Sequence, residues 1–383
     1  MLNSIEIFSG AGGLAKGLEL AGVNHEAFVE LNSQACKTLR QNYAKKLVYE
    51  GNIELFNFQN FKNISIIAGG PPCQPFSLGG NHKGHLDKRD MFPYAIKAIQ
   101  QLTPKAFIFE NVKGLLRKSF ASYFNYILLQ LTYPEIIRKP EEEWLNHLKR
   151  LEKNHTSGGK NSLKYNIVYR LINSADYGVP QKRERVIIVG IRNDLNLSWS
   201  FPQPTHSEES LLWSQFVTKE YWGRHNISDL SSSLVSQSIL QKTKKLKQQY
   251  SLFAPLQKPW RTVRDAIGHL PTPNARELTE HQDHIFRPGA KAYPGHTGSP
   301  LDLPSKTIKA GDHGVPGGEN MIRYPNGEVR YYTTLEAKLI QTFPASYQIT
   351  GVWSEAMRQI GNAVPVKLAN VISSSVVKEL TVQ

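Results

Sequence analysis

The first 30 residues constrain the fold most, because they have the pattern of a strand, a glycine-rich loop, a helix and a second strand. A short β-strand pattern at 5–8 precedes a loop at 9–13, and a helical pattern over 14–21 leads into a strand over 23–29 that Glu30 closes. An acid at that position usually holds a ribose hydroxyl. The loop is not a G-x-G-x-x-G, and many glycine loops only turn the chain, so an adenosine-containing cofactor is one of two open interpretations.

The alternation of strands and helices continues to about residue 191. We predict helices over 33–43 and 90–102 and strands over 47–49, 66–68, 106–109, 166–172 and 186–191. The chain is therefore α/β, with a Rossmann-like, doubly wound mixed sheet over residues 1–191. Residues 117–164 have the composition of a solvated surface lobe inserted between core elements.

After residue 192 the amino-acid composition changes, because residues 193–330 are rich in Pro, Gly, Ser and His. We predict a second, smaller, irregular domain over 192–349 and a C-terminal segment, 350–383, that returns to the first domain. Thr333 and Glu336 have the spacing of a capping box at the start of a helix, and Pro365 is placed to open a long one over 366–380.

Cys73 follows an apolar strand and the rigid turn Gly69-Gly70-Pro71-Pro72. Ligands of open α/β sheets collect at the carboxyl ends of strands, so a thiol there is placed to be a nucleophile. The alternative is a small hydrophobic residue buried in a tight turn, which is the commoner fate of a free cysteine.

Glu110 and two arginines are further candidates. Glu110 ends a predicted strand beside the one that leads to Cys73, although an acid there could also sit at a helix N-terminus. Arg183 and Arg185 alternate at the start of the last core strand, which predicts that they project to one face.

The composition narrows the partners. The net charge of +14 suggests a polyanion such as nucleic acid, although it is also compatible with plain solubility. Only two cysteines occur, and they lack the spacing of metal ligands, so we expect no metal and no disulfide. No signal peptide or membrane span is recognisable, so we expect a cytoplasmic chain without a membrane partner.

The irregular domain carries the most concentrated basic stretch. Four lysines lie within six residues, Lys242, Lys244, Lys245 and Lys247, and on a helix they could not all face one groove. Candidate base-reading residues lie later, between about 274 and 330. They are His281, His284, Arg287, Lys309, Asp312, His313 and Arg323.

Five motifs in order make the chain resemble the bacterial type of C5-cytosine-specific DNA methyltransferases. They are residues 8–14 (Phe-Ser-Gly-Ala-Gly-Gly-Leu), 71–74 (Pro-Pro-Cys-Gln), 110–112 (Glu-Asn-Val), 181–185 (Gln-Lys-Arg-Glu-Arg) and 361–364 (Gly-Asn-Ala-Val). The resemblance covers residues 5–191 and 331–380, and it makes the irregular domain a target-recognition domain.

The resemblance implies S-adenosylmethionine as cofactor. The residues that would hold it are Phe8, Ser9, Gly10, Ala11, Gly12, Gly13, Leu14, Glu30, Leu31, Asn52, Ile53, Pro72, Asn362 and Val364. Two positions depart from the family pattern: Leu31 stands where an aromatic often stacks on adenine, and Asn52 replaces an acid.

The resemblance also implies a covalent mechanism on a flipped cytosine, with Cys73 as nucleophile on C6 and Glu110 at N3. Arg185 would bind O2 or orient Glu110, and Arg183 would be a weaker partner. We expect a monomer acting on double-stranded DNA, within a restriction-modification or epigenetic marking system. The expected DNA contacts are Gln74, Ser77, Lys83, Arg89, Lys242, Lys245, Arg287, Lys309 and Arg323. A loop over 78–88 would close over the base.

Three alternatives remain at this point. A tRNA-directed member of the same family would keep the fold and the cysteine. A catalytically silent DNA-binding relative would have no need of Cys73, Glu110 and Arg185. A nicotinamide or flavin oxidoreductase shares only the first strand–helix–strand unit.

Overall fold

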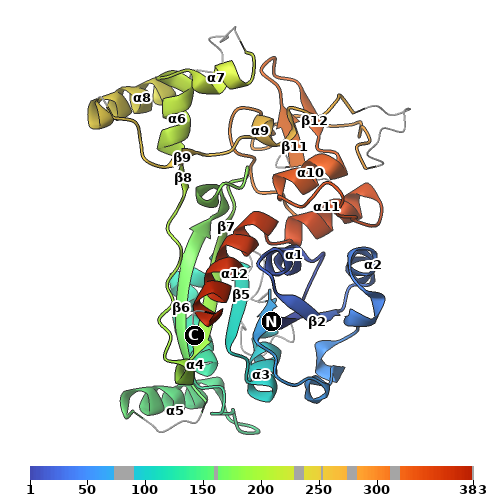
Figure 1. Ribbon diagram of the computed structural model, residues 1–383, viewed down its shortest axis with the longest axis vertical. Coiled ribbons are helices and arrows are strands. Elements are labelled where there is room, and N and C mark those ends of the chain that lie inside the picture. Colours follow the sequence, from blue (N-terminus) through green and yellow to red (C-terminus); the bar gives the residue numbers. More distant parts are fainter. Residues whose placement is uncertain are drawn as a thin grey trace. The chain divides into compact units, whose positions relative to one another are not determined.

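The computed structural model describes residues 1–72, 90–158, 163–227, 237–251, 253–273, 283–310 and 320–381. The chain divides into two compact units (Figure 1). Unit 1 comprises residues 1–172, 184–202 and 369–383, and unit 2 comprises residues 173–183 and 203–368. These bounds differ from the predicted ones, because residues 350–368 group with unit 2 and only residues from Ala369 onward return to unit 1.

Seven strands form the central sheet among the described residues. They are β1 (Asn3–Ile7), β2 (Asn24–Glu30), β3 (Val48–Glu50), β4 (Ile66–Gly69), β5 (Ala106–Val112), β6 (Tyr165–Asn173) and β7 (Glu184–Arg192). Their order is β3-β2-β1-β4-β5-β7-β6. Strands β3, β2, β1, β4 and β5 pair in parallel, and β7 pairs antiparallel with β5. The predicted doubly wound mixed sheet is confirmed, and the strand order reverses between β1 and β4, which is where sheets of this kind bind ligands.

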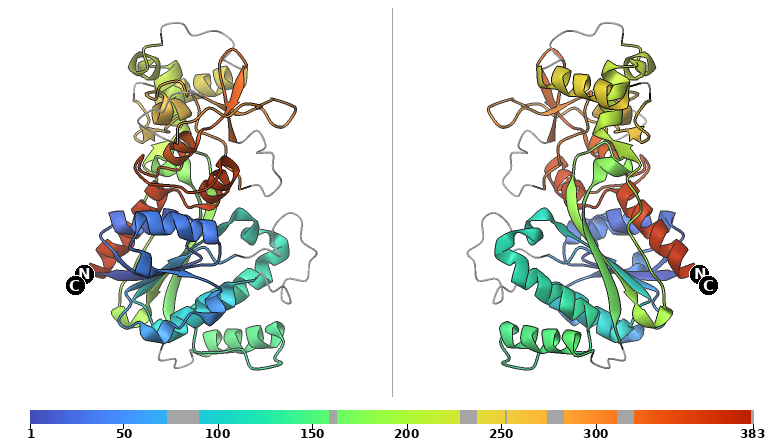
Figure 2. Two further views of the ribbon diagram at one scale, coloured as in Figure 1. Left: turned by 90° about the vertical axis from the view of Figure 1, so that its right-hand side faces the viewer. Right: turned by 90° about the vertical axis from the view of Figure 1, so that its left-hand side faces the viewer.

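Helices cover both faces of this sheet (Figure 2). They are α1 (Gly13–Leu20), α2 (Ser33–Asn42), α3 (Phe92–Leu102), α4 (Ala121–Thr132) and α12 (Val366–Thr381), while α5 (Trp144–Thr156) packs against α4. One apolar core joins Ile5 and Ile7 of β1 to α3 and α4, and a second joins Phe28 of β2 to α1 and α2. Each core therefore uses alternate residues of the strands.

Close packing of α1 against α12 depends on Gly17. A Cβ on this residue would lie 2.3 Å from the Cβ of Ala369, so no larger residue fits without a shift. Residues Trp353–Thr381 form the one stretch in the described residues that is long and apolar enough to cross a membrane by length and composition. The protein itself buries 61% of its apolar window, as it does with an ordinary core helix.

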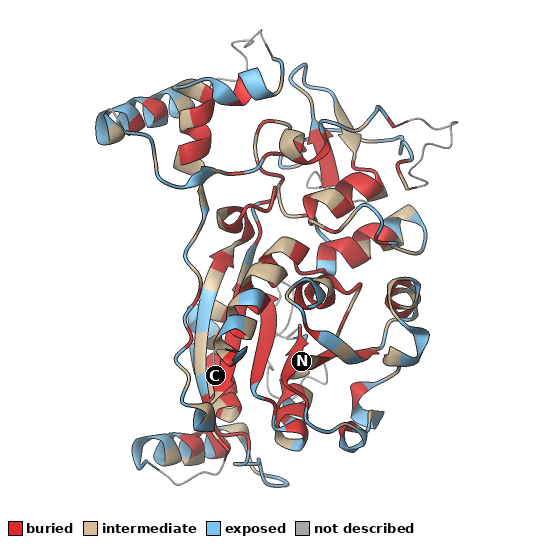
Figure 3. Ribbon diagram, viewed as in Figure 1, coloured by how far each residue is buried: buried red, intermediate tan, exposed pale blue. Residues whose placement is uncertain are grey.

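The predicted insertion forms the helix pair α4 and α5. Figure 3 shows a largely exposed α5 beside buried sheet strands, and the pair has its own small core around Tyr126, Tyr133 and Leu151. The His147 ring accepts or donates at 2.8 Å to the Tyr126 hydroxyl and lies 2.7 Å from the Ile136 carbonyl. His147 therefore has a structural role.

Unit 2 consists of short elements. Its helices are α6 (Glu208–Phe216), α7 (Glu220–Arg224), α8 (Gln237–Tyr250), α9 (Val263–Ile267), α10 (Thr334–Ile340) and α11 (Trp353–Asn362). Its strands are β8 (His206–Ser207), β9 (Lys258–Pro259), β10 (Ser299–Pro300), β11 (Met321–Arg323) and β12 (Val329–Tyr331). The predicted capping box of Thr333 and Glu336 opens α10, with both reciprocal hydrogen bonds present.

Candidate active site

The glycine loop connects β1 to α1 in a conformation that favours glycine. Phe8, Gly10 and Gly12 have φ values of 54°, 54° and 81°. Among the described residues, nothing lies within 4 Å of the position that a Cβ would take on Gly10. The Ser9 hydroxyl donates to the Glu6 carbonyl at 2.9 Å, and Ala11, Gly13 and Leu14 are buried. The loop therefore presents an open backbone surface at the carboxyl end of β1.

Glu30 fixes this loop from the end of β2. Its Oε2 accepts from the Gly10 N–H at 2.7 Å, and its Oε1 accepts from the Asn32 N–H at 2.8 Å. A carboxylate offers about four acceptor positions, so two remain for a ligand hydroxyl. Leu31 follows it with 70% of its surface exposed, so an apolar side chain lies beside the acid.

The other predicted cofactor residues occupy varied positions. Asn52 is exposed, and its side chain caps a short 3₁₀ turn by accepting from the Glu54 N–H at 3.0 Å. Ile53 is buried in the core of unit 1, whereas Pro72 is exposed. Asn362 and Val364 belong to unit 2, exposed and buried respectively.

Glu110 and Arg185 form an ion pair on neighbouring strands. Arg185 Nε lies 2.7 Å from Glu110 Oε1, and both side chains are largely buried. Within the described residues no hydrogen bond of good geometry reaches Oε1, so this buried acceptor is held by charge rather than by an aligned N–H. Glu110 lies inside β5, so the helix N-terminus alternative is wrong.

The residues before Cys73 lie beside Glu110 and are hydrogen-bonded to its neighbour Asn111 and to Met91. A Cβ on Gly70 would lie 3.4 Å from Glu110 Oε2, and the Asn111 amide donates to the Pro71 carbonyl at 3.0 Å. The Met91 N–H donates to the Pro72 carbonyl at 3.0 Å. Asn111 belongs to the motif at 110–112, but the sequence does not indicate its hydrogen bond to the turn before Cys73. Cys73, Gln74, Ser77, Lys83, Arg89 and the expected closing loop at 78–88 lie outside the described residues.

Arg183 does not share the environment of Arg185. It precedes β7 instead of starting it, so the alternation of side chains in a strand does not apply. Its side chain is 1% exposed and donates to the carbonyls of Ile308, at 3.3 Å, and Gly361, at 2.8 Å. The prediction that the two arginines project to one face is therefore wrong.

Unit 2 presents most of the predicted DNA-contacting residues at its surface. Lys242 and Lys245 lie on α8 and are exposed, and so are Arg287, Lys309 and Arg323. His284 does not fit, because it is buried and bonded to the Thr333 hydroxyl and the Pro271 carbonyl. It is a core histidine and not a base-reading residue. His281, Asp312 and His313 lie outside the described part of the chain.

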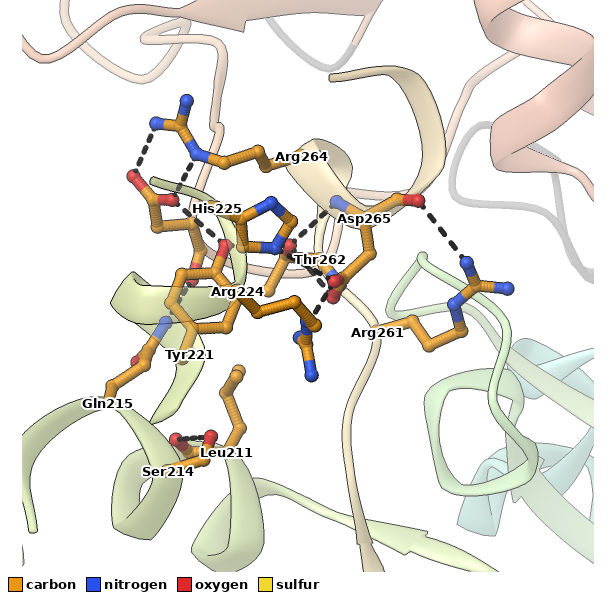
Figure 4. Close-up of polar contacts among 11 residues, drawn as sticks. Leu211, Ser214, Gln215, Tyr221, Arg224, His225, Arg261, Thr262, Arg264 and Asp265 are labelled. Carbon is orange, nitrogen blue, oxygen red and sulfur yellow. Dashed lines mark hydrogen bonds and ion pairs between the residues drawn. The ribbon is translucent and has the colours of Figure 1, made fainter. Parts of the chain in front are cut away.

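A polar network stabilises the interior of unit 2 (Figure 4). The Tyr221 hydroxyl lies 2.8 Å from the Thr262 hydroxyl and 2.9 Å from Asp302, and Arg264 binds Asp302 through two nitrogens at 2.6 and 3.0 Å. Burial raises the pKa of Tyr221. Asp265 caps α9 and also binds Arg224 and His225. The carboxylates of Asp265 and Asp302 are therefore already bound by basic side chains of unit 2.

The sheet, the glycine loop and the buried acid–arginine pair define a Rossmann-like α/β enzyme. The family model for C-5 cytosine-specific DNA methylases matches residues 2–133 and 143–378, and the chain belongs to that family. It is accordingly a DNA cytosine-5 methyltransferase that uses a methyl donor.

Relatives and solved structures agree with this assignment. Type II methyltransferase M.Eco47II of Escherichia coli is 31% identical over 97% of this chain and 78% of its own length. M.NgoMIV of Neisseria gonorrhoeae is 35% identical, but over only 58% of this chain and 64% of its own length. The fold is similar to that of a proposed DNA modification methyltransferase from an E. coli prophage, with a TM-score of 0.61, 19% identity and 99% coverage of both chains.

Proposed function

We propose that this methyltransferase acts through Cys73, which adds to C6 of a cytosine turned out of duplex DNA, and that S-adenosylmethionine is the methyl donor. The observation that carries the proposal is the Glu110–Arg185 ion pair beside Gly70, Pro71 and Pro72. Cys73 is the next residue in the chain after Pro72.

Each residue has a distinct part in this mechanism. The Cys73 thiolate forms a bond to C6, which moves electron density onto N3 and O2 and makes C5 nucleophilic. Glu110 holds or protonates N3, and Arg185 keeps the Glu110 carboxylate in place and faces the developing charge. After methyl transfer, a base removes the C5 proton and the Cys73–C6 bond breaks. The target base is inaccessible inside a duplex, so it must be flipped out.

The cofactor assignment fits the residues of unit 1. Gly10 leaves open space beside the loop backbone, and Glu30 retains acceptor positions for ribose hydroxyls. Leu31 supplies an exposed apolar surface for adenine in place of an aromatic ring. When bound, S-adenosylmethionine supplies an electrophilic methyl group, and the loop and Glu30 orient it.

Replacing Cys73 with Ala should abolish methyl transfer and leave cofactor binding intact, because the thiol bonds to the base. Cys36→Ala is the matched control. Cys36 is buried against the Glu30 carbonyl, and burial raises its pKa to about 12, so it should be dispensable for the reaction. Incorporation of labelled methyl groups into duplex DNA measures both. More than a few per cent of wild-type rate in Cys73→Ala would contradict the nucleophile assignment.

A duplex that carries 5-fluorocytosine tests the covalent step directly. Fluorine cannot leave as the C5 proton does, so an adduct between protein and DNA should survive denaturation when cofactor is present. Cys73→Ala should form none. Activity on ordinary cytosine without any adduct would exclude covalent catalysis.

We also propose that the target is a specific duplex sequence and that the enzyme serves a restriction-modification system, as the names of its type II relatives suggest. Bisulfite sequencing of DNA from cells that express the chain should show methylation at one short sequence. Parallel assays on transfer RNA and plasmid DNA distinguish this from the tRNA-directed alternative. Methylation of tRNA alone would contradict the proposal.

A further inference from the structure

A cluster of cationic side chains surrounds Gly178 in unit 2. Gly178 has a φ of 79°, and a Cβ on it would lie 2.8 Å from both His206 Nε2 and Lys367 Nζ. Two nitrogens of basic side chains thus converge on one point of the backbone. Lys258 is the register partner of His206 in the β8–β9 pair, and Arg261 follows shortly after β9.

The acids in the described part of unit 2 do not balance these charges. In the described residues no ion pair reaches Lys258, Arg261 or Lys367. Arg261 donates only to the backbone carbonyl of Asp265, at 3.2 Å (Figure 4), because the Asp265 carboxylate is taken by Arg224 and His225. Asp176 accepts from the Trp260 indole N–H at 2.9 Å, and Glu208 pairs with Lys182 and Lys242.

The protonation of the cluster reflects this unbalanced charge. Burial, together with the charges of Lys367, Lys258 and Arg261, lowers the pKa of His206 to about 4. Burial also lowers the pKa of Lys367, helped by Arg261 and Lys258. Lys367 is moreover the second residue of α12, where the positive end of the helix dipole disfavours a cation. The cluster is therefore a cost to the folded protein without a bound anion.

We propose that His206, Lys258, Arg261 and Lys367 form a binding site for a phosphate group of the DNA backbone, outside the base-reading part of unit 2. A phosphate supplies the negative charge that the described residues around the cluster do not, and its oxygens accept hydrogen bonds from ammonium, guanidinium and imidazole N–H groups. DNA is the source that the family supports, so this inference rests on the proposed duplex substrate. Such a contact positions the protein and does not specify sequence.

A double variant, Lys258→Gln with Lys367→Gln, tests the site. Binding to duplex DNA should weaken for every sequence, and the slope of log K against log salt should fall by about one unit. The set of methylated sites should not change. The control is Lys45→Gln with Lys46→Gln, which removes the same charge from exposed positions of unit 1 and should leave the slope unchanged.

Two readouts separate this site from a structural role. The unfolding midpoint of the free double variant should equal or exceed that of the wild type, because repulsion is removed; a marked fall would contradict the proposal. The His206 pKa, measured by NMR on the full chain with His206→Gln for assignment, should rise by at least one unit with a short duplex.

Four results would overturn the proposal: an unchanged salt slope, a marked fall in the unfolding midpoint, an unmoved His206 pKa, or a His206 pKa that responds to inorganic phosphate or S-adenosylmethionine but not to duplex. Failure of the proposed function looks different, because the wild-type chain would then not methylate duplex DNA at all.

Discussion

Glu110 and Arg185 illustrate how a strand pair builds a reaction centre from single residues. Glu110 faces Ile187 across the antiparallel β5–β7 pair, and Arg185 faces Val112, two positions along. The diagonal contact lets the long arginine side chain reach the carboxylate. A buried carboxylate is costly unless a charge accompanies it, so Arg185 makes the site possible energetically as well as chemically.

Replacing Glu110 with Gln should reduce the rate of methyl transfer far more than DNA affinity. Gln keeps the shape and can still donate from its amide, but it cannot pass a proton to N3. We expect a loss on the order of 10²-fold or more, measured under single-turnover conditions with DNA binding measured in parallel. An unchanged rate would leave Glu110 with a purely structural role.

Arg183 and Arg185 should separate stability from activity. Arg183→Met removes the donors to two backbone carbonyls in unit 2 and should cost about 2–4 kcal/mol of unfolding free energy. Arg185→Met should instead reduce the rate of methyl transfer, with a smaller effect on stability. Urea unfolding and methyl incorporation, both measured on each variant, distinguish the structural role of Arg183 from the proposed catalytic role of Arg185. Equal stability losses would contradict the division of roles.

The difference between these two arginines was not predictable from the sequence. Both occur in one five-residue motif, and only the start of β7 at Glu184 determines which of them follows strand geometry. The capping box at Thr333 was predictable, because its hydrogen bonds are local. Arg183 bonds to residues more than 100 positions away, and no local pattern encodes those contacts.

Among the elements, the sheet strands and their helices were predicted well because apolar periodicity and glycine turns mark them locally. In unit 2 the elements are short, and α8 combines mostly exposed polar residues with a narrow buried side at Thr243 and Leu246. A sequence with such a weak apolar stripe indicates neither a helix nor its packing partner. The four lysines of α8 are all exposed, and their spacing distributes them over more than one side of the helix, as predicted.

Replacing Lys242, Lys244, Lys245 and Lys247 together with Gln should weaken DNA binding equally across sequences. Only some of them can face one groove, so the salt slope should fall by about one unit per true phosphate contact, for one or two contacts. Titrations at several salt concentrations, together with bisulfite maps, measure both effects. Methylation of different sites at undiminished affinity would place base reading on α8.

For the whole molecule, a buried pair in unit 1 links stability to pH. Glu6 is fully buried on β1, and its Oε1 lies 3.9 Å from His25 Nδ1. Burial raises the pKa of Glu6 well above its usual value and lowers that of His25 to about 4. His25 is therefore neutral in the folded protein near pH 6, and burial favours the protonated, neutral form of Glu6.

The two groups act on stability in opposite directions. His25 binds a proton below pH 6.5 in the unfolded chain but only below about pH 4 in the folded protein. The free energy of unfolding therefore increases by about 3 kcal/mol as the pH rises from 4 to 6.5. Folded Glu6 stays protonated where the unfolded chain ionises, so its contribution falls as pH rises from about 4.5 through its folded pKa.

Glu6→Gln should remove the second effect, since the amide resembles the protonated acid and cannot ionise. Urea unfolding at pH 5, 7 and 8.5 should show similar stability for variant and wild type at pH 5 and a growing advantage for the variant above it. Parallel curves for the two proteins would show that Glu6 does not ionise in this range.

The path of the chain between the two units has a consequence for how such enzymes acquire new specificities. All of unit 2 except residues 173–183 is one uninterrupted stretch, residues 203–368. Arg183, on the short separate piece, binds carbonyl oxygens of that stretch, which any replacement sequence of the same backbone course also supplies. Two recombination breakpoints in the gene, near codons 203 and 368, therefore exchange this stretch whole while Glu110 and Arg185 are inherited, and the incoming sequence has to supply its own counterparts of Asn362 and Val364.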